Sequence, residues 1–154
     1  MISGLVEGDK ETYLESFEPS YITALKKSFD TTGSQPFLSE LGYQYRDVEN
    51  FDGLINVFFE MNAMALESNY GDDISVSLSF DSCHEVSLES VNDALDVNYT
   101  IYSIPKDAKS AVEVSVNMSI SSTKDEIKAQ HNFILIQSSD ENWYIHPKFF
   151  LYTI

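Results

Sequence analysis

The sequence has a single cysteine, Cys83, and few basic residues, and each shortage excludes a class of protein. One cysteine cannot form an intrachain disulfide, so packing must hold the fold together. Nine Lys and Arg residues stand against 25 Asp and Glu residues, which gives a formal net charge of −16. Such a surface repels phosphate backbones and anionic lipid, so we expect no nucleic-acid partner. The acids are scattered, a pattern typical of a soluble surface, and a cationic partner or substrate is the functional alternative.

Long apolar runs are missing as well. The longest are short stretches such as FILI (133–136), so we expect no direct membrane insertion by this domain. No signal peptide is recognisable, and the chain begins abruptly with what looks like the last turns of a helix before Gly8 and Asp9. We therefore expect an N-terminal segment to precede Met1.

What the chain does contain is enough apolar material for one folded domain. Hydrophobic residues make up 43% of the sequence, and 10 Phe, 9 Tyr and one Trp are too many aromatics for a solvated tail. No repeat, low-complexity segment or interdomain linker interrupts the chain. We therefore treat residues 1–154 as a single domain.

Helical spacing of apolar residues predicts several helices in the first half. Asp9 can cap one of them, and Pro19 suits the first turn of the next, where its missing N–H costs nothing. The longest helix should run from about Asp52 to Asn69 and end at Gly71 in a left-handed cap. The apolar positions that define these helices are Tyr13, Leu14 and Phe17, then Ile22, Leu25 and Phe29, then Leu54, Ile55, Phe58, Phe59, Met61, Ala65 and Leu66.

Beyond Gly71 the apolar period changes from 3.6 to 2, which predicts strands. Apolar residues alternate with serines over 74–80, as in a half-buried antiparallel strand. The strand at 129–138 is apolar on both faces, so both should be covered, one by helices and the other by a neighbour or a second chain. Helices followed by consecutive antiparallel strands indicate the α+β class. The other predicted elements are a short helix at Ser87–Leu95 and strands at 97–104, 111–121 and 142–152.

Three stretches carry a family resemblance: LVEGDKETYLESFEPSYI (5–22), LESNYGDDISVSLSF (66–80) and SSDENWYIHPKF (138–149). Together they resemble the nuclear-transport-factor-2-like (cystatin-like) superfamily over nearly the whole chain. The resemblance implies an α+β roll, in which N-terminal helices pack on a strongly curved antiparallel sheet. Its motifs are structural: a Gly-Asp helix break, the Tyr70-Gly71 helix exit, and Trp143-Tyr144 near the final strand.

More narrowly, the chain looks like the uncharacterised domains of secreted lipoproteins from Gram-positive, often gut-dwelling, bacteria. That resemblance implies an extracellular or cell-surface location, with lipid anchoring through an upstream segment. The superfamily holds isomerases, dehydratases and epoxide hydrolases as well as binding modules, so the fold does not decide the function. Its enzymes use Asp, His or Tyr inside the cone between helices and sheet, and no motif fixes such residues here.

The stretch FDSCHEVS (80–87) concentrates the reactive side chains of the chain. A thiol–imidazole pair needs both side chains within hydrogen-bond reach, but consecutive strand residues point to opposite faces. If the strand continues regularly from Ile74, His84 faces the core with Phe80, whereas Cys83 faces outward with Asp81 and Glu85. We therefore expect no catalytic residue here and a passive exposed thiol, with an interchain disulfide as the alternative.

The sequence predicts neither a metal site nor another cofactor. Alternate strand residues Asp81, Cys83 and Glu85 lie about 7 Å apart, which is wide for a shared ion. His131 and His146 stand alone on other predicted strands. The acidic stretch DVENFDG (47–53) lacks the alternation and glycine placement of a calcium loop.

His84 keeps one functional hypothesis. A lone His on an apolar face is usually a hydrogen-bonded core residue, and the alternative is that it lines a cone-shaped cavity. In that case the pocket residues would be His84 and Phe80 from the first strand, with Tyr99 and the long-helix residue Phe58.

The leading functional hypothesis is a non-catalytic extracytoplasmic domain that binds a small molecule or a protein. It rests on the resemblance and on the absence of any paired acid–base or nucleophile constellation. The alternatives are a small-molecule enzyme of the isomerase or dehydratase type that uses the cone pocket, and a homodimer-forming structural module suggested by the two-faced strand at 133–136.

Overall fold

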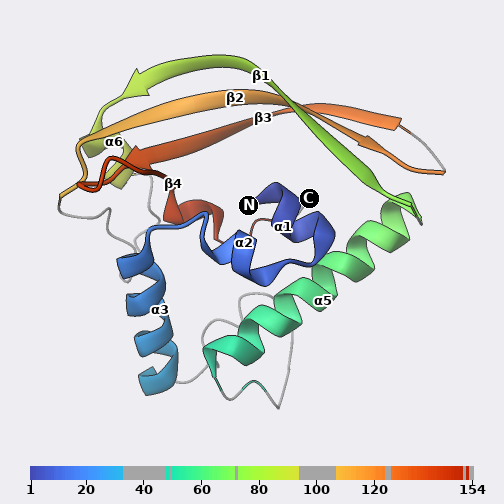
Figure 1. Cartoon of the computed structure of the whole chain (residues 1–154), viewed down its shortest axis with the longest axis horizontal. Coiled ribbons are helices and arrows are strands. Elements are labelled where there is room, and N and C mark those ends of the chain that lie inside the picture. Colours follow the sequence, from blue (N-terminus) through green and yellow to red (C-terminus); the bar gives the residue numbers. More distant parts are fainter. Residues whose placement is uncertain are drawn as a thin grey trace.

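The computed structural model describes residues 1–32, 48, 50–71, 73–93, 107–123, 126–150 and 152. Over these residues the fold is α+β, with helices packed on an open four-stranded antiparallel sheet of order β1-β2-β3-β4. Figure 1 shows the three long strands arching over α1 and α2, which lie between the sheet and α5. The helices are α1 (Ile2–Glu7), α2 (Lys10–Leu14), α3 (Pro19–Thr32), α5 (Phe51–Tyr70) and α6 (Leu88–Asp93).

Local capping explains where the helices begin and end, and it confirms the predicted Gly-Asp break. Gly8 ends α1 with φ 71°, a left-handed conformation that glycine adopts without steric cost. Asp9 caps α2 by accepting the Thr12 backbone N–H at 3.1 Å and the Thr12 hydroxyl at 2.7 Å. Gly4 has no room for a side chain, because a Cβ there would lie 2.8 Å from the Asp9 carbonyl oxygen. The start of the chain is thus a tight helix–turn–helix.

The long helix α5 also matches its prediction. Asn50 caps it by accepting the Gly53 backbone N–H at 2.8 Å. Gly71 ends it as predicted, but the predicted left-handed cap is wrong: φ is 83° and ψ is −158°, which lies outside the left-handed helical region. Buried apolar residues of α3 and α5 join Tyr13 and Phe17 in a helical core, and the members on α3 and α5 are Tyr21, Leu25, Phe29, Phe51, Leu54, Ile55, Phe58 and Phe59.

The strands are β1 (Ser75–Val86), β2 (Ser110–Ser121), β3 (Glu126–Gln137) and β4 (Trp143–Ile145). The predicted final strand at 142–152 is wrong beyond Ile145, where Pro147–Phe149 forms a 3-10 helix. Proline has no backbone N–H to donate, so Pro147 cannot continue a strand ladder. The predicted strand at 97–104 lies outside the described residues.

Apolar clusters cover opposite faces of the sheet at its two ends. On the face toward α1, Ile2 packs against Met118, Ile120 and Phe133. On the other face, Val91 of α6 packs against Ala111, Ile134 and Ile136. The prediction that both faces of 133–136 are covered is therefore confirmed, and elements of the same chain cover them. The argument for a second chain at this strand is removed.

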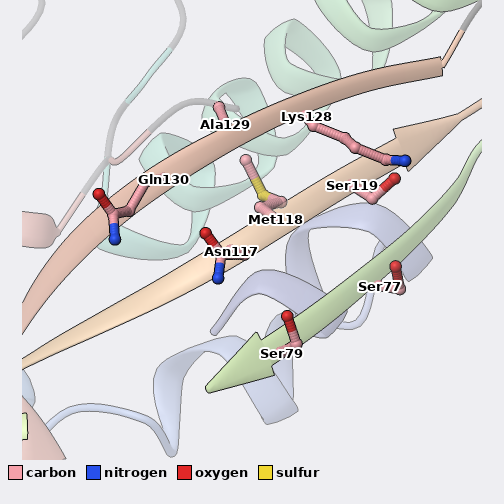
Figure 2. A pocket seen from close by; sticks show the side chains of 8 residues that line it. All are labelled: Ser77, Ser79, Asn117, Met118, Ser119, Lys128, Ala129 and Gln130. Atoms are coloured by element: carbon pink, nitrogen blue, oxygen red, sulfur yellow. The ribbon is translucent and has the colours of Figure 1, made fainter. Parts of the chain in front are cut away.

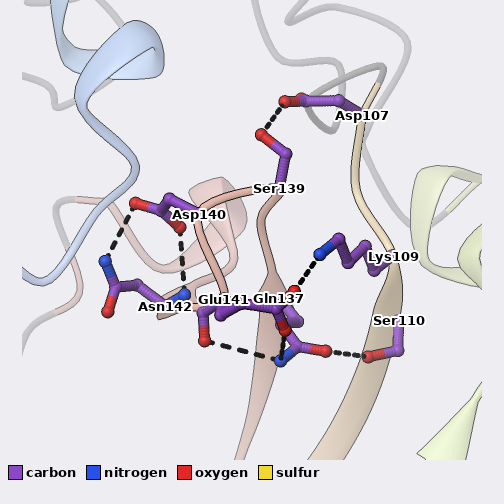
Figure 3. A network of polar contacts seen from close by, with 8 residues as sticks. All are labelled: Asp107, Lys109, Ser110, Gln137, Ser139, Asp140, Glu141 and Asn142. Atoms are coloured by element: carbon purple, nitrogen blue, oxygen red, sulfur yellow. Dashed lines mark hydrogen bonds and ion pairs between the residues drawn. The ribbon is translucent and has the colours of Figure 1, made fainter.

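A polar network holds the turn between β3 and β4 (Figure 3). Asp140 accepts the Asn142 backbone N–H at 3.0 Å and its side-chain amide at 2.9 Å, and these bonds lower the pKa of Asp140. The hydroxyl of Tyr144 donates to the same carboxylate at 2.9 Å. Lys109 forms an ion pair with Glu141, and Gln137 accepts from the Ser110 hydroxyl at 3.1 Å. These groups satisfy one another, which marks a structural turn.

Candidate functional site

Strand β1 forms one edge of the sheet in the described part of the chain. It pairs with β2 over its full length, from Ser75 opposite Ser121 to Val86 opposite Ala111. Its other side pairs with no described strand. A strand of 12 residues in this position presents a long row of backbone N–H and C=O groups that can bond to another extended chain.

A β-bulge divides β1 and changes which side chains face the helices. Phe80 lies opposite Val116 and Ser82 lies opposite Ser115, so Asp81 is an extra residue without a partner. Directly opposed residues share a face, and Val116 packs with the cluster that faces α1. The bulge therefore leaves Val76, Leu78 and Phe80 on this inner face and reverses the alternation of the residues after it.

The reversal corrects the predicted directions of Cys83 and His84. Cys83 lies opposite Val114 on the inner face, and His84 lies opposite Glu113 on the outer face. The predicted inward position of His84 is wrong: its side chain is 58% exposed and its Nε2 lies 3.1 Å from a Glu113 carboxylate oxygen. Cys83 was expected to face outward and faces inward, although its thiol is exposed as predicted. The conclusion that the two cannot pair stands, because they remain on opposite faces.

The inner side of β1 is apolar and becomes more exposed along the strand. Val76 is partly buried against the sheet cluster, whereas Leu78 is 49% and Phe80 69% exposed. Behind them on β2, Met118 and Ile120 are buried, but Val114 and Val116 are only half-buried. We call Leu78, Phe80 and Cys83, together with Val114 and Val116, the β1 apolar strip. Large exposed apolar side chains gathered in this way are typical of an interaction surface.

An open cleft begins at one end of the β1 apolar strip, between α1 and the start of β1. Its volume is about 410 Å³. The wall on the α1 side is formed by Ile2, Ser3, Val6 and Glu7, and the wall on the strand side by Ile74, Ser75, Val76 and Leu78. Apolar side chains thus continue from the strip into a recess of a size suited to side chains of a bound segment.

The three predicted pocket residues that the structure describes lie in three different places. His84 lies on the outer face, and Phe80 lies on the inner face at the sheet edge. Phe58 is 3% exposed and packs in the helical core, with its ring centroid 5.6 Å from that of Tyr13. Tyr99 lies outside the described residues. Of the three described residues, Phe80 alone belongs to the candidate site at β1.

Sequence reasoning missed a contact between His131 and Tyr152, since His131 seemed to stand alone on its strand. The Tyr152 hydroxyl and His131 Nδ1 are 2.7 Å apart. Both rings contact Phe133, with centroids 6.4 Å and 5.5 Å from it. Burial raises the pKa of Tyr152, and His131 Nε2 is buried without a hydrogen-bond partner in the described structure. The pair sits among aromatic rings and was not detectable from spacing, because 21 residues separate its members.

The outer face of the same strands is polar (Figure 2). A shallow groove of about 330 Å³ is lined there by residues of β1, β2 and β3. Several of them bond to neighbours on that face: Gln130 donates to Asp81 at 2.9 Å, and Ser119 donates to Glu126 at 3.0 Å. A polar outer face is the ordinary condition of an antiparallel sheet with one solvated side. The groove residues are Ser77, Ser79, Asn117, Met118, Ser119, Lys128, Ala129 and Gln130.

The described residues hold neither a metal-binding cluster nor a membrane-spanning helix. They contain no group of three or more His, Cys, Asp and Glu side chains arranged to hold a metal ion. Among them, no helix is both long and apolar enough to span a membrane.

Comparison with known proteins adds no neighbour to these observations. No protein-family model, curated protein or solved structure matches the chain.

Proposed function

We propose that this protein is a non-catalytic binding domain that takes up an extended polypeptide segment along the β1 edge. The observation that carries the proposal is the long edge of β1, unpaired within the described structure, beside the β1 apolar strip and its cleft. In this binding mode, main-chain hydrogen bonds supply affinity, and recesses for alternate side chains supply specificity. The partner would add a strand next to β1 and place every second side chain on the inner face.

The sequence resemblance supports the wider setting of this proposal. In this wider proposal, the chain is a nuclear-transport-factor-2-like domain with a curved α+β roll, and the protein is secreted or lipid-anchored at a bacterial cell surface. The helices packed on an antiparallel sheet are compatible with that fold class. An extracellular location would suit a domain whose partners are peptide segments of other surface or secreted proteins.

The first prediction tests edge binding with two soluble peptides of about ten residues, the length needed to span β1. One alternates valine with lysine and the other valine with serine. We expect at least one to bind and to slow amide hydrogen exchange in β1. Its backbone N-methylated analogue, which cannot complete a ladder, should bind at least about tenfold more weakly. Fluorescence anisotropy of labelled peptide gives the affinity, and hydrogen exchange locates the site.

Matched variants distinguish specific binding at the β1 apolar strip from nonspecific hydrophobic binding elsewhere on the surface. Leu78→Ser and Phe80→Ser should each weaken binding about fivefold, since each removes about 1 kcal/mol of apolar burial. Met64→Ser is the control, because Met64 is also 69% exposed but lies on α5. Equal losses in all three variants, or no protection of β1 amides by either peptide, would contradict the proposal.

One observation favours the alternative of a small-molecule enzyme, namely the contact between Tyr152 and His131. A hydroxyl and an imidazole within 2.7 Å can exchange a proton, as an isomerase or dehydratase requires. Catalysis also needs substrate access, and His131 Nε2 is buried next to Phe133. The pair is therefore better explained as a packed polar contact beneath the sheet, and binding at the β1 edge remains our proposal.

A further inference from the structure

The chemistry around β1 narrows the kind of segment that can bind there. We infer that the occupant alternates apolar and basic residues, with its apolar side chains on the inner face and its Lys or Arg side chains on the outer face and at its ends. This inference rests on the proposed function, because it specifies the partner of the same edge.

The apolar half of the pattern follows from the register of β1. Val76, Leu78, Phe80 and Cys83 share the inner face, so a strand added beside them places every second side chain next to an apolar neighbour. At the start of the strand these side chains would enter the cleft between Val6 and Val76. A rise of about 3.3 Å per residue means that about eight to ten residues would follow β1 from Val76 to its end.

The basic half of the pattern follows from charge. Residues 1–7 and 73–86 contain no Lys or Arg, but they contain four acidic residues. Glu7 lines the cleft, and Asp81 lies at the bulge with its carboxylate on the outer face, where it accepts from Gln130 at 2.9 Å. Glu85 follows on the inner side near the end of the strand, and Asp73 precedes the strand. An acidic occupant would meet repulsion at both ends of the edge and at the bulge, whereas basic side chains would be attracted there. Lys128, which lines the outer groove beside Ser77 and Ser79, is paired with Glu126 at 3.1 Å.

Net charge also argues against a second copy of this chain as the occupant. Each copy carries a formal charge of −16, and edge-to-edge pairing would bring two acidic β1 strands together. Such like-charge approach slows association and weakens the complex at low ionic strength. A positively charged segment is instead attracted by the negative charge of this chain.

The test compares three peptides that differ only at alternate positions: valine–lysine, valine–serine and valine–glutamate. We expect the lysine peptide to bind about tenfold more tightly than the serine peptide, and the glutamate peptide not to bind measurably. Raising the salt concentration from about 20 mM to about 300 mM should remove most of the lysine advantage. Serine-peptide affinity should change little over that range.

Variants that remove only the charge identify which acidic residues attract the lysine peptide. Asp81→Asn keeps an oxygen that can accept from Gln130, and Glu85→Gln keeps the side-chain length. Each variant should lower the affinity for the lysine peptide about threefold and leave the affinity for the serine peptide unchanged. Glu60→Gln, on the exposed side of α5, is the matched control and should change neither.

The possible failures are distinguishable. If the serine and lysine peptides protect β1 with equal affinity at every salt concentration, the basic pattern is overturned and edge binding survives. If no peptide binds but sedimentation shows a dimer with protected β1 amides, a second copy occupies the edge, and both the inference and the proposed function are wrong. If nothing protects β1, both are also wrong.

Discussion

His146 shows how a single buried side chain can make this fold sensitive to pH. Its side chain is fully buried, and its Nδ1 accepts the Lys148 backbone N–H at 3.0 Å, which caps the 3-10 helix. Its own backbone N–H donates to the Ile134 carbonyl at 2.9 Å and ties this segment to β3. Burial, assisted by the nearby Lys148 charge, lowers the pKa of His146 to about 4. The folded state therefore holds a neutral imidazole where the unfolded chain binds a proton.

A pH titration of stability tests this effect. Because the folded pKa lies below the unfolded one, the neutral His146 contributes its full stability above about pH 6.5 and loses it as the pH falls to about 4. The loss should approach about 3 kcal/mol in the free energy of unfolding. Urea unfolding of wild type and His146→Asn at several pH values isolates it, since an asparagine oxygen can still cap the helix. Parallel pH profiles for the two proteins would refute this account.

At the scale of elements, the bulge in β1 determines which side chains form the candidate site. An extra residue, Asp81, puts Cys83 inward and His84 outward, against the regular alternation. A bulged strand can reverse its alternation in this way because the extra residue forms no pair in the hydrogen-bonded ladder. Without the bulge, His84 would have joined Phe80 on the inner face.

Two single-residue deletions of equal length test this assignment. Removing Asp81 should leave every other residue of β1 on its present face, because Phe80 opposite Val116 and Ser82 opposite Ser115 already fit a regular ladder. We expect the melting temperature to fall by only about 3 °C, from loss of the exposed bond to Gln130. Removing Ser79 should instead turn Phe80 outward and Asp81 inward, and lower the melting temperature by about 8 °C or more. Circular dichroism melts would measure both, and similar losses would argue against the bulge assignment.

The same scale separates what the sequence could predict from what it could not. Helix bounds were predictable because the caps at Asp9 and Gly71 and the apolar periodicity are local. The burial of both faces of strand β3 was also predictable from its own apolar residues. The sequence carried one unused signal for the bulge: Ser82 stands where regular alternation requires an apolar residue, and Cys83 follows one place later.

The candidate site depended on contacts between distant parts of the chain. The position of β1 at an edge of the described sheet is a property of strand order, which no stretch of β1 encodes. The cleft joins Val6 to Val76, and the His131–Tyr152 contact joins the middle of β3 to the segment after the 3-10 helix through tertiary packing. Side-chain direction could be derived from alternation only as far as the first irregular residue, which is why His84 was misplaced.

At the scale of the whole molecule, acidic charge both limits the partners and weakens the folded state. A net charge of −16 on 154 residues creates self-repulsion that grows when the chain is compact. Opposing it are ion pairs such as Lys26–Asp52 at 3.5 Å, whose side chains are 53% and 76% exposed. Exposed pairs of this kind contribute between about 0 and 1 kcal/mol each. Repulsion among the surplus acids should therefore dominate the response of stability to salt.

Moderate salt should stabilise the protein for this reason. Raising NaCl from about 10 mM to about 300 mM shortens the screening length from about 30 Å to below 8 Å, which weakens long-range repulsion more than contact ion pairs. We expect the free energy of unfolding to rise by about 1 kcal/mol, measured by urea denaturation at neutral pH, where urea adds no charge. A charge-neutral osmolyte at matched osmolality is the control for general solvent effects. A fall in stability with NaCl would mean that the exposed ion pairs outweigh the repulsion, and it would also remove the electrostatic argument for a basic partner at β1.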